Sequence, residues 1–289
     1  MILVTGSTGV IGAAVVRELT GHSAAVRALT RDSERARSSL GPDVELVIGS
    51  YDDAESLTTA MDGVDQVFVL CPIHPELVRW EAKVVAAARP TRVSHVVKLS
   101  TAGVEWVGQG PPVPTLWALH RQGEQKIEQS GVPFTHLWPD ACMQNVLMFT
   151  DPIAAGVYPS PTGEGRRAWV DVRDVAAAAA VVLTEPGHEG RSYELTGPEA
   201  LSDDDVAAKI SASTGRVVKH IDPPVEVARK NMVDKGMLTN VADMLSEVMV
   251  AIAAGRSGKT AGGVREVTGR PPRSFDAFCS EFRSRFSSN

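Results

Sequence analysis

The chain has 289 residues, 43% of them hydrophobic and 22% charged, with a formal net charge of −6 at pH 7. This balance is typical of a folded, water-soluble protein and excludes a largely disordered chain. The acidic charge disfavours a nucleic-acid partner, because a general nucleic-acid binder needs a basic face. The longest strongly apolar run, residues 175–183, is too short to span a bilayer, so no membrane partner is expected.

The three cysteines, Cys71, Cys142 and Cys279, are odd in number and far apart. A disulfide framework is therefore not expected, and a reducing compartment fits best. The apolar start has no Lys or Arg before it and is interrupted by glycines, unlike a secretion signal. We expect a cytoplasmic protein that is a monomer or a homodimer.

Apolar runs alternate with segments of helical spacing through the first half of the chain. Strands are predicted at residues 1–5, 24–30, 44–48, 65–71, 95–99 and 134–138. Helices are predicted at residues 10–20, 33–40, 54–61, 76–89 and 120–130. This alternation predicts parallel βαβ units, and right-handed crossovers assemble them into a Rossmann-type, doubly wound α/β sheet.

The second half is less regular, and the tail from Ser202 is mostly helical in pattern. We expect residues 1–139 to form a NAD(P)-binding core, with residues 166–197 returning to it. Residues 140–165 and 198–289 are expected to form a small, mostly helical C-terminal substrate domain that caps this core. The alanine run at residues 176–180 predicts a helix packed closely on the sheet.

The first strand leads into a glycine loop, Gly6-Ser-Thr-Gly9-Val-Ile-Gly12, which a helix follows. Gly6 permits the tight turn, Gly9 allows the backbone to approach a pyrophosphate, and Gly12 allows the helix to pack against the strand. The start of the helix offers free N–H groups to the phosphates. Its place in a βαβ pattern makes this GxxGxxG spacing a dinucleotide-binding motif.

The end of the second strand distinguishes the two nicotinamide cofactors. An acidic residue there binds a ribose 2′-hydroxyl, whereas an arginine accommodates a 2′-phosphate. The chain has Thr30-Arg31, with Asp32 only after the tip and Arg35 one turn further on. We therefore favour NADP(H), leave NAD(H) open, and expect neither metal nor flavin.

A second phosphate-loop pattern occurs at residues 253–260, AAGRSGKT. A true loop of this kind follows a strand and precedes a helix, but here the preceding segment reads as helix and Ala-Gly-Gly follows. We do not expect an ATP site there.

Ordinary short-chain dehydrogenases pass a proton through a Tyr-x-x-x-Lys pair. The three tyrosines, Tyr51, Tyr158 and Tyr193, have Glu55, Thr162 and Gly197 four residues on. The tyrosine-based mechanism is therefore excluded.

The chain resembles the NmrA-like atypical short-chain dehydrogenases over nearly its whole length. The resemblance is carried by GSTGVIG, Thr30-Arg31, residues 51–57, Val97-Lys-Leu-Ser100 and His120-x-x-x-Glu124. Residues 187–197 and 242–245 look closer still to the type 2 NAD(P)H:quinone oxidoreductase subgroup. Members of this family bind NADP(H) in a Rossmann core, and a small C-terminal domain forms a cleft above the nicotinamide.

The resemblance also implies the cofactor-binding residues. They are Gly6, Thr8, Gly9, Val10, Ile11 and Arg31 at the adenine side, Leu70, Cys71 and Pro72 along the approach to the nicotinamide, Lys98 and Ser100 below the cofactor, and Pro139 beside the nicotinamide. Family members often have an aspartate after the position of Gly49 that contacts the adenine. Ser50 stands there instead, which implies weaker or backbone-mediated adenine binding.

Two side chains are candidates for the chemistry. His120 is expected to donate a proton or orient the substrate, on account of the resemblance and its ordinary pKa near neutrality, with an exposed surface histidine as the alternative. Lys98 lies in an apolar strand and could hydrogen-bond the cofactor ribose. An aromatic pocket could be lined by Trp106, Trp117, Trp138, Met143, Asn145, Met148 and Phe149, with core packing as the alternative for most of them.

Three functions follow from this sequence. The first is an NAD(P)H-dependent oxidoreductase that reduces a quinone or a related polycyclic aromatic ketone by direct hydride transfer, which needs little acid catalysis. The second is a tailoring oxidoreductase or monooxygenase component that acts on an aromatic polyketide quinone. The third is a non-catalytic redox sensor that binds NADP.

Overall fold

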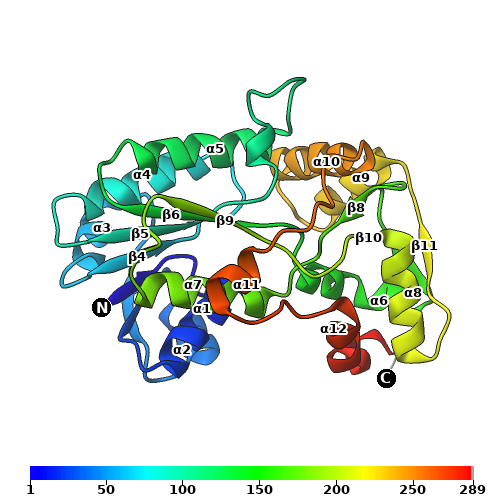
Figure 1. The fold of residues 1–289 in the computed structure, drawn as a ribbon, viewed down its shortest axis with the longest axis horizontal. Helices are drawn as coiled ribbons and strands as arrows, with labels where there is room; N and C mark the ends of the chain where they lie inside the picture. The colour runs from blue at the N-terminus through cyan, green and yellow to red at the C-terminus, as the bar shows by residue number, and fades with distance from the viewer. Residues whose placement is uncertain (288–289) are drawn as a thin grey trace.

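The computed structural model describes residues 1–287 and contains a parallel seven-stranded sheet (Figure 1). The strand order is β3-β2-β1-β4-β5-β6-β9. The strands are β1 (Ile2–Val4), β2 (Val26–Thr30), β3 (Glu45–Ile48), β4 (Gln66–Val69), β5 (His95–Leu99), β6 (Phe134–Pro139) and β9 (Arg191–Leu195). The order reverses direction beside β1, and every neighbouring pair is parallel, which confirms the predicted doubly wound α/β fold.

The central strands are buried on both faces. In β1, Ile2 and Val4 pack into the core on one face of the sheet, and Leu3 packs into the core on the other. Alternate residues of a strand point to opposite faces, so a sheet covered on both sides requires apolar residues at every position. This explains why the strand segments read as continuous apolar runs.

Helices cover both faces of the sheet (Figure 1). One face carries α1 (Val10–Gly21), α2 (Ser33–Leu40) and α7 (Val172–Thr184), and the other carries α3 (Ala54–Ala60), α4 (Leu77–Ala88) and α5 (Thr115–Glu128). The predicted close packing of the alanine run is present, since Ala178, Ala179 and Ala180 of α7 are completely buried in the core shared with α1.

The largest difference from the predicted elements is the start of α5. This helix begins at Thr115 and not at residue 120, because Pro114 ends the preceding loop as the helix N-cap with an extended backbone (ψ 139°). A proline at this boundary loses no intrahelical hydrogen bond. His120 consequently lies in the second turn of α5 and not at the helix start.

The C-terminal part forms a second lobe with its own apolar core (Figure 1). It is mostly helical, as predicted, and also holds two small two-stranded sheets. Its elements are η2 (Met143–Phe149), α6 (Thr150–Ala154), β7 (Val157–Pro159), β8 (Arg166–Arg167), β10 (Leu201–Ser202), α8 (Asp203–Thr214), β11 (Lys219–Ile221), α9 (Val225–Asp234), α10 (Thr239–Ala253), α12 (Phe275–Glu281) and η3 (Arg283–Phe286).

Helix α11 (Gly263–Thr268) in the C-terminal tail packs on the sheet and not in the cap, where it was expected. Val264 and Val267 of α11 pack into the core of the sheet with α7 and β9. Residues 263–268 therefore belong to the dinucleotide-type core, although the expectation placed residues 198–289 in the cap. The chain thus crosses back to the sheet a second time before α12. No helix within residues 1–287 combines the length and the apolar character that a bilayer span requires.

Candidate functional site

The glycine loop after β1 is shaped by steric contact with the loop after β4. Gly6 has φ +60°, and a Cβ there would lie 2.5 Å from the carbonyl oxygen of Leu70. A Cβ on Gly12 would lie 2.2 Å from the carbonyl oxygen of Gly6. Gly12 therefore lets α1 pack against the glycine loop itself, and not against the strand, where the glycine spacing had led us to expect it.

The N-terminus of α1 is open to an anion. Gly9 is the N-cap residue, no side chain caps the helix, and no acidic residue lies in its first turn. A Cβ on Gly9 would meet only the carbonyl oxygen of Gly6, at 3.4 Å, so the space in front of the helix is free. Free N–H groups at the positive end of a helix fit the pyrophosphate of a dinucleotide. Thr8, Val10 and Ile11 flank this opening and are accessible to solvent to different degrees.

The end of β2 lies beside this loop, because Ser7 Oγ donates a hydrogen bond to the carbonyl oxygen of Leu29 at 3.0 Å. The carboxylate of Asp32 is engaged as the N-cap of α2, where it accepts a hydrogen bond from the backbone N–H of Arg35 at 3.0 Å. Arg31 is exposed and makes no ion pair within residues 1–287. Its guanidinium is thus available to an anionic ligand.

The backbone after β3 and β4 is fixed by side chains. Ser50 donates its backbone N–H to Ser56 Oγ at 3.2 Å, and Tyr51 donates its hydroxyl to the carbonyl oxygen of Leu70 at 2.8 Å. Burial raises the pKa of both the Tyr51 phenol and the neighbouring Cys71 thiol. Pro72 follows at the exposed edge. This part of the site therefore presents neutral groups and backbone.

A buried ionic cluster lies where β5 faces α4 and α5. Lys98 and Glu81 are both 0% exposed, and their side chains form an ion pair. Lys98 Nζ also lies 3.3 Å from Nδ1 of His120 and 3.5 Å from the carbonyl oxygen of Leu99. An ammonium has three N–H donors, and these three acceptors use them all. The expected contact between Lys98 and a cofactor ribose is therefore replaced by contacts inside the protein.

His120 is buried, with 8% of its surface exposed, so the alternative of a surface histidine is wrong. Burial, and secondarily the charge of Lys98, hold the pKa of His120 well below its usual range. The expectation of a histidine that titrates near neutrality is therefore also wrong. His120 is a neutral imidazole at physiological pH.

The buried histidines predict an acid-sensitive fold. Burial lowers the pKa of His95, His120 and His136 in the folded protein. As pH falls below the unfolded value of about 6.5, only the unfolded chain takes up these protons, so stability falls with pH by up to about 1.4 kcal/mol per pH unit for each group. Urea unfolding between about pH 7.5 and about pH 5.5 should show a smaller loss for His120→Gln than for the wild type. The exposed His22→Gln variant is the control, and a loss in His120→Gln as large as in the wild type would contradict the assignment.

Gly123 makes room for this cluster. A Cβ there would lie 1.8 Å from Oε2 of Glu81, an oxygen that is buried and has no hydrogen-bond partner. Alanine favours a helix interior over glycine by about 1 kcal/mol, so an exposed glycine would gain from the change. We expect Gly123→Ala to lower the free energy of unfolding instead, because it displaces the Glu81 carboxylate. Urea unfolding measures this, and a more stable variant would contradict the packing.

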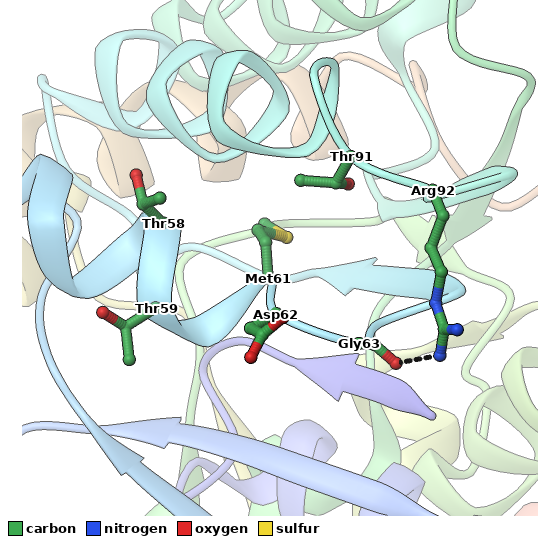
Figure 2. A pocket seen from close by; sticks show the side chains of 7 residues that line it. All are labelled: Thr58, Thr59, Met61, Asp62, Gly63, Thr91 and Arg92. Atoms are coloured by element: carbon green, nitrogen blue, oxygen red, sulfur yellow. Dashed lines mark hydrogen bonds between the residues drawn. The ribbon is translucent and has the colours of Figure 1, made fainter.

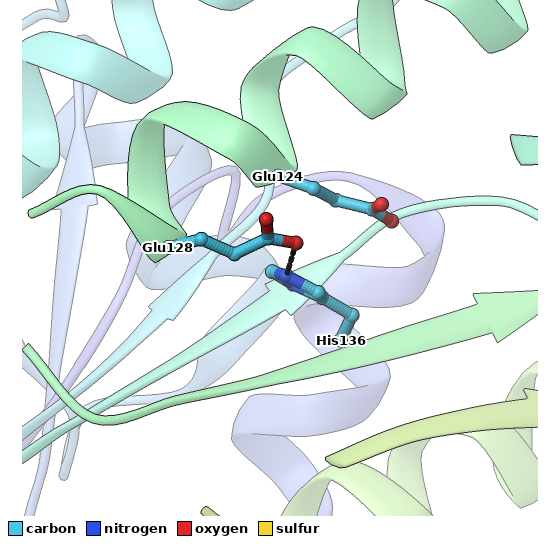
Figure 3. A group of neighbouring side chains, drawn as sticks. All are labelled: Glu124, Glu128 and His136. Carbon is cyan, nitrogen blue, oxygen red and sulfur yellow. Dashed lines mark ion pairs between the residues drawn. The ribbon is translucent and has the colours of Figure 1, made fainter. Parts of the chain in front are cut away.

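A second group of titratable side chains, on α5 and β6, consists of Glu124, Glu128 and His136 (Figure 3). Nη1 of Arg121 binds Oε2 of Glu124 at 3.0 Å and Oε1 of Glu128 at 2.6 Å. Nε1 of Trp138 binds the remaining oxygen of Glu124 at 2.7 Å. The carboxylate oxygens of Glu124 and Glu128 therefore already accept hydrogen bonds from Arg121 and Trp138. We assign this group of residues to the packing of α5 on the sheet.

The residues expected to line an aromatic pocket are dispersed. Met143 is completely buried in the core of the second lobe, and Phe149 packs edge-on against Tyr158 in the same core. Trp117 is buried against Gly103, while Trp106 is 44% exposed. Asn145 and Met148 lie on the surface. Core packing is therefore the correct interpretation for Met143 and Trp117, and the residues do not form one pocket.

Two surface cavities lie away from the glycine loop. The larger, of about 600 Å³, is lined by residues that include Met61, Gly63 and Arg92 (Figure 2). These residues belong to turns that lead into β4 and β5, and hence to the amino ends of the strands, whereas ligands of such sheets bind at the carboxyl ends. The smaller cavity, of about 250 Å³, lies between Gly197 and Pro272.

Ser100, Pro139 and Asp140 lie at the carboxyl ends of β5 and β6. Ser100 follows β5 and is buried, and its Oγ has no hydrogen-bond partner in the described part of the chain. An unpaired buried hydroxyl at this edge fits a polar ligand. Pro139 ends β6, and Asp140 follows it.

The second phosphate-loop pattern, at residues 253–260, follows helix α10 and not a strand. Its Ser257 donates a hydrogen bond to Asp140 at 3.2 Å.

Glu81 and Gly123 were missed in the sequence, although a signal for Glu81 was present. The buried positions of α4 are Leu77, Glu81, Val84, Val85 and Ala88, and a glutamate in such an apolar stripe requires a buried partner.

The fold and the glycine loop together define a dinucleotide-binding protein of the doubly wound class. Residues 1–254 match the NmrA-like family, and the chain belongs to it, as predicted. The NAD(P)H azoreductase of Xenophilus azovorans is 36% identical over 99% of both chains. The (4-alkanoyl-5-oxo-2,5-dihydrofuran-3-yl)methyl phosphate reductase of Streptomyces griseus is also 36% identical over 99% of both chains.

A solved structure of the NADPH-dependent quinone oxidoreductase QOR2 of Escherichia coli, in complex with NADPH, has the same fold. It superposes with a TM-score of 0.86 at 24% identity and covers 98% of this chain and 99% of the other. The chain is a NAD(P)H-dependent oxidoreductase, as are the two relatives that are 36% identical to it.

Proposed function

We propose that the protein reduces a quinone or a related conjugated aromatic acceptor with a hydride from NADPH. The observation that carries this proposal is that three polar groups at the carboxyl edge of the sheet are neutral: the imidazole of His120, the phenol of Tyr51 and the hydroxyl of Ser100. When bound, the nicotinamide supplies the hydride. Without a strong acid, the acceptor must tolerate the incoming negative charge, as an electron-poor conjugated system does.

The names of the relatives support this acceptor class. An azo compound, a quinone and a dihydrofuranone with an alkanoyl group are all conjugated acceptors with oxygen or nitrogen lone pairs. His120 can donate a hydrogen bond to such a lone pair, and the hydroxyl of Ser100 can donate another. These contacts would orient the acceptor and stabilise the charge that develops on it.

The preference for NADP(H) rests on Arg31. Asp32 is engaged as the cap of α2, so Arg31, which forms no ion pair within residues 1–287, is the charged group presented at the tip of β2. Arg31→Ala should weaken NADPH binding by about 10- to 150-fold and leave NADH binding unchanged, since a charge-assisted hydrogen bond contributes about 1.5–3 kcal/mol. Arg17→Ala, an exposed arginine on α1, is the control for charge alone. Equal losses for both cofactors in Arg31→Ala would contradict the preference.

A panel of acceptors tests the proposed reaction. NADPH oxidation should be rapid with naphthoquinones and azo dyes and slow with simple ketones, which are poor hydride acceptors without an acid. Tight NADPH binding without any turnover would identify a redox sensor instead. Consumption of oxygen together with a polycyclic quinone would identify a tailoring monooxygenase component.

A further inference from the structure

The contacts in the cluster Glu81–Lys98–His120 determine which ring nitrogen of His120 carries the proton. Nδ1 of His120 faces Nζ of Lys98 at 3.3 Å. Lys98 is ion-paired with Glu81, both are completely buried, and an ammonium cannot accept a hydrogen bond. Nδ1 must therefore be the acceptor, and the single proton of the neutral ring lies on Nε2.

The other ring nitrogen of His120, Nε2, has different surroundings from Nδ1. In the described part of the chain, Nε2 of His120 has no hydrogen-bond partner, and it is not among the fully buried side-chain atoms that lack one. The Nε2–H group is therefore reachable by solvent or by a ligand. The second turn of α5, which carries His120, and the second turn of α4, which carries Glu81, both lie near the carboxyl ends of the neighbouring strands.

We propose that Glu81 and Lys98 are positioning residues that fix His120 in the Nε2–H tautomer, so that it serves as a neutral hydrogen-bond donor to the acceptor substrate. The substrate class is one with a carbonyl or azo lone pair, and no proton leaves the imidazole. This inference rests on the proposed function for the identity of the ligand, but the tautomer itself is a property of the free protein. A neutral histidine in such a role is a known pattern of electrophilic assistance.

Three features of the packing support a dedicated arrangement. Gly123 leaves space for the Glu81 carboxylate that a Cβ would fill. The three donors of Lys98 have three acceptors, so the ammonium has one defined orientation. Outside the cluster, the charge of Glu124 on α5 acts on Glu81, and Arg121 and Trp138 engage the Glu124 carboxylate.

The test is the ring-nitrogen spectrum of the free protein, with histidine labelled with nitrogen-15 and the His120 signals assigned by their loss in His120→Gln. The wild type should show the Nε2–H tautomer of His120 with no change between about pH 5.5 and about pH 8. In the double variant Glu81→Gln/Lys98→Met, which removes both charges together, His120 should show averaged tautomers, because no ammonium then faces Nδ1.

Lys83→Met is the matched control, because Lys83 lies on the same helix as Glu81 and pairs with Asp52 at the surface. It should leave the His120 signals unchanged. A wild-type spectrum with the Nδ1–H tautomer, or an unchanged spectrum in the double variant, would overturn the inference. These spectra are recorded without cofactor or substrate, so a protein that holds the tautomer but turns over no acceptor refutes the proposed function and leaves the positioning role intact.

A second readout links the tautomer to catalysis. Quinone reduction by the double variant should show a lower kcat with an unchanged NADPH dissociation constant, because only a fraction of the His120 rings then carry the proton on Nε2. A role in folding alone would lower the amount of active protein and leave the kcat of the folded, NADPH-binding molecules unchanged.

Discussion

Gly9→Asp should abolish measurable NADPH binding while the fold stays intact. The helix N-terminus at Gly9 has no capping side chain, and its free N–H groups are the structural basis of phosphate binding. An aspartate there would cap these groups itself and place a negative charge against the pyrophosphate. Because both effects act on the same phosphates, we expect the dissociation constant of NADPH to rise by on the order of 100-fold or more.

The loss of NADPH binding in Gly9→Asp should not be caused by misfolding. A Cβ on Gly9 meets only one carbonyl oxygen, at 3.4 Å, so the substitution introduces no severe clash. The variant should unfold at the wild-type urea concentration or above it, since an aspartate is a favourable N-cap residue. Gly9→Ala is the neutral control and should bind NADPH more weakly by a smaller factor. Wild-type NADPH binding in Gly9→Asp, measured by calorimetry, would contradict the placement of the phosphates.

Lys98→Met should strongly destabilise the core. It leaves the completely buried Glu81 carboxylate without its partner, and breaking a buried ion pair in this way costs about 3–5 kcal/mol. Burial already raises the pKa of Glu81, so the carboxyl of the variant is expected to take up a proton more readily still. A folded pKa above the unfolded value gives stability that is lost as pH rises. The destabilisation of Lys98→Met should therefore be smaller at about pH 5.5 than at about pH 8.

A double variant distinguishes the lost charge from lost packing. Replacing both partners by apolar side chains, as in Glu81→Leu/Lys98→Met, should recover most of the stability that the single change removes. Urea unfolding at several pH values measures all three proteins. A single variant as stable as the wild type, or a double variant less stable than the single one, would show that the ion pair does not govern this part of the core.

The sequence was sufficient for the first six strands of the sheet because their signals are local. The strand at residues 95–99 and the helix at residues 33–40 were predicted with the bounds that β5 and α2 have in the structure. The return of α11 to the sheet was not predictable in this way, since it depends on the packing of Val264 and Val267 against α7, far away in the chain.

The same distinction applies to the candidate site. The glycine loop could be predicted because its three glycines and the following helix lie in one short segment. The state of His120 could not, because its partners come from β5 and α4, and their burial reverses the titration that the residue type suggests. Of the residues predicted for an aromatic pocket, Met143 and Phe149 belong to the core of the second lobe, which composition alone does not reveal.

The central claim is that this chain transfers a hydride from NADPH to a conjugated acceptor. An anaerobic single-turnover experiment tests it directly: the protein is loaded with NADPH deuterated at the transferred position and mixed with a naphthoquinone. We expect one NADPH to be oxidised for each quinone reduced, more slowly than with the undeuterated cofactor. NADPH that stays bound and reduced in the presence of the quinone would contradict it.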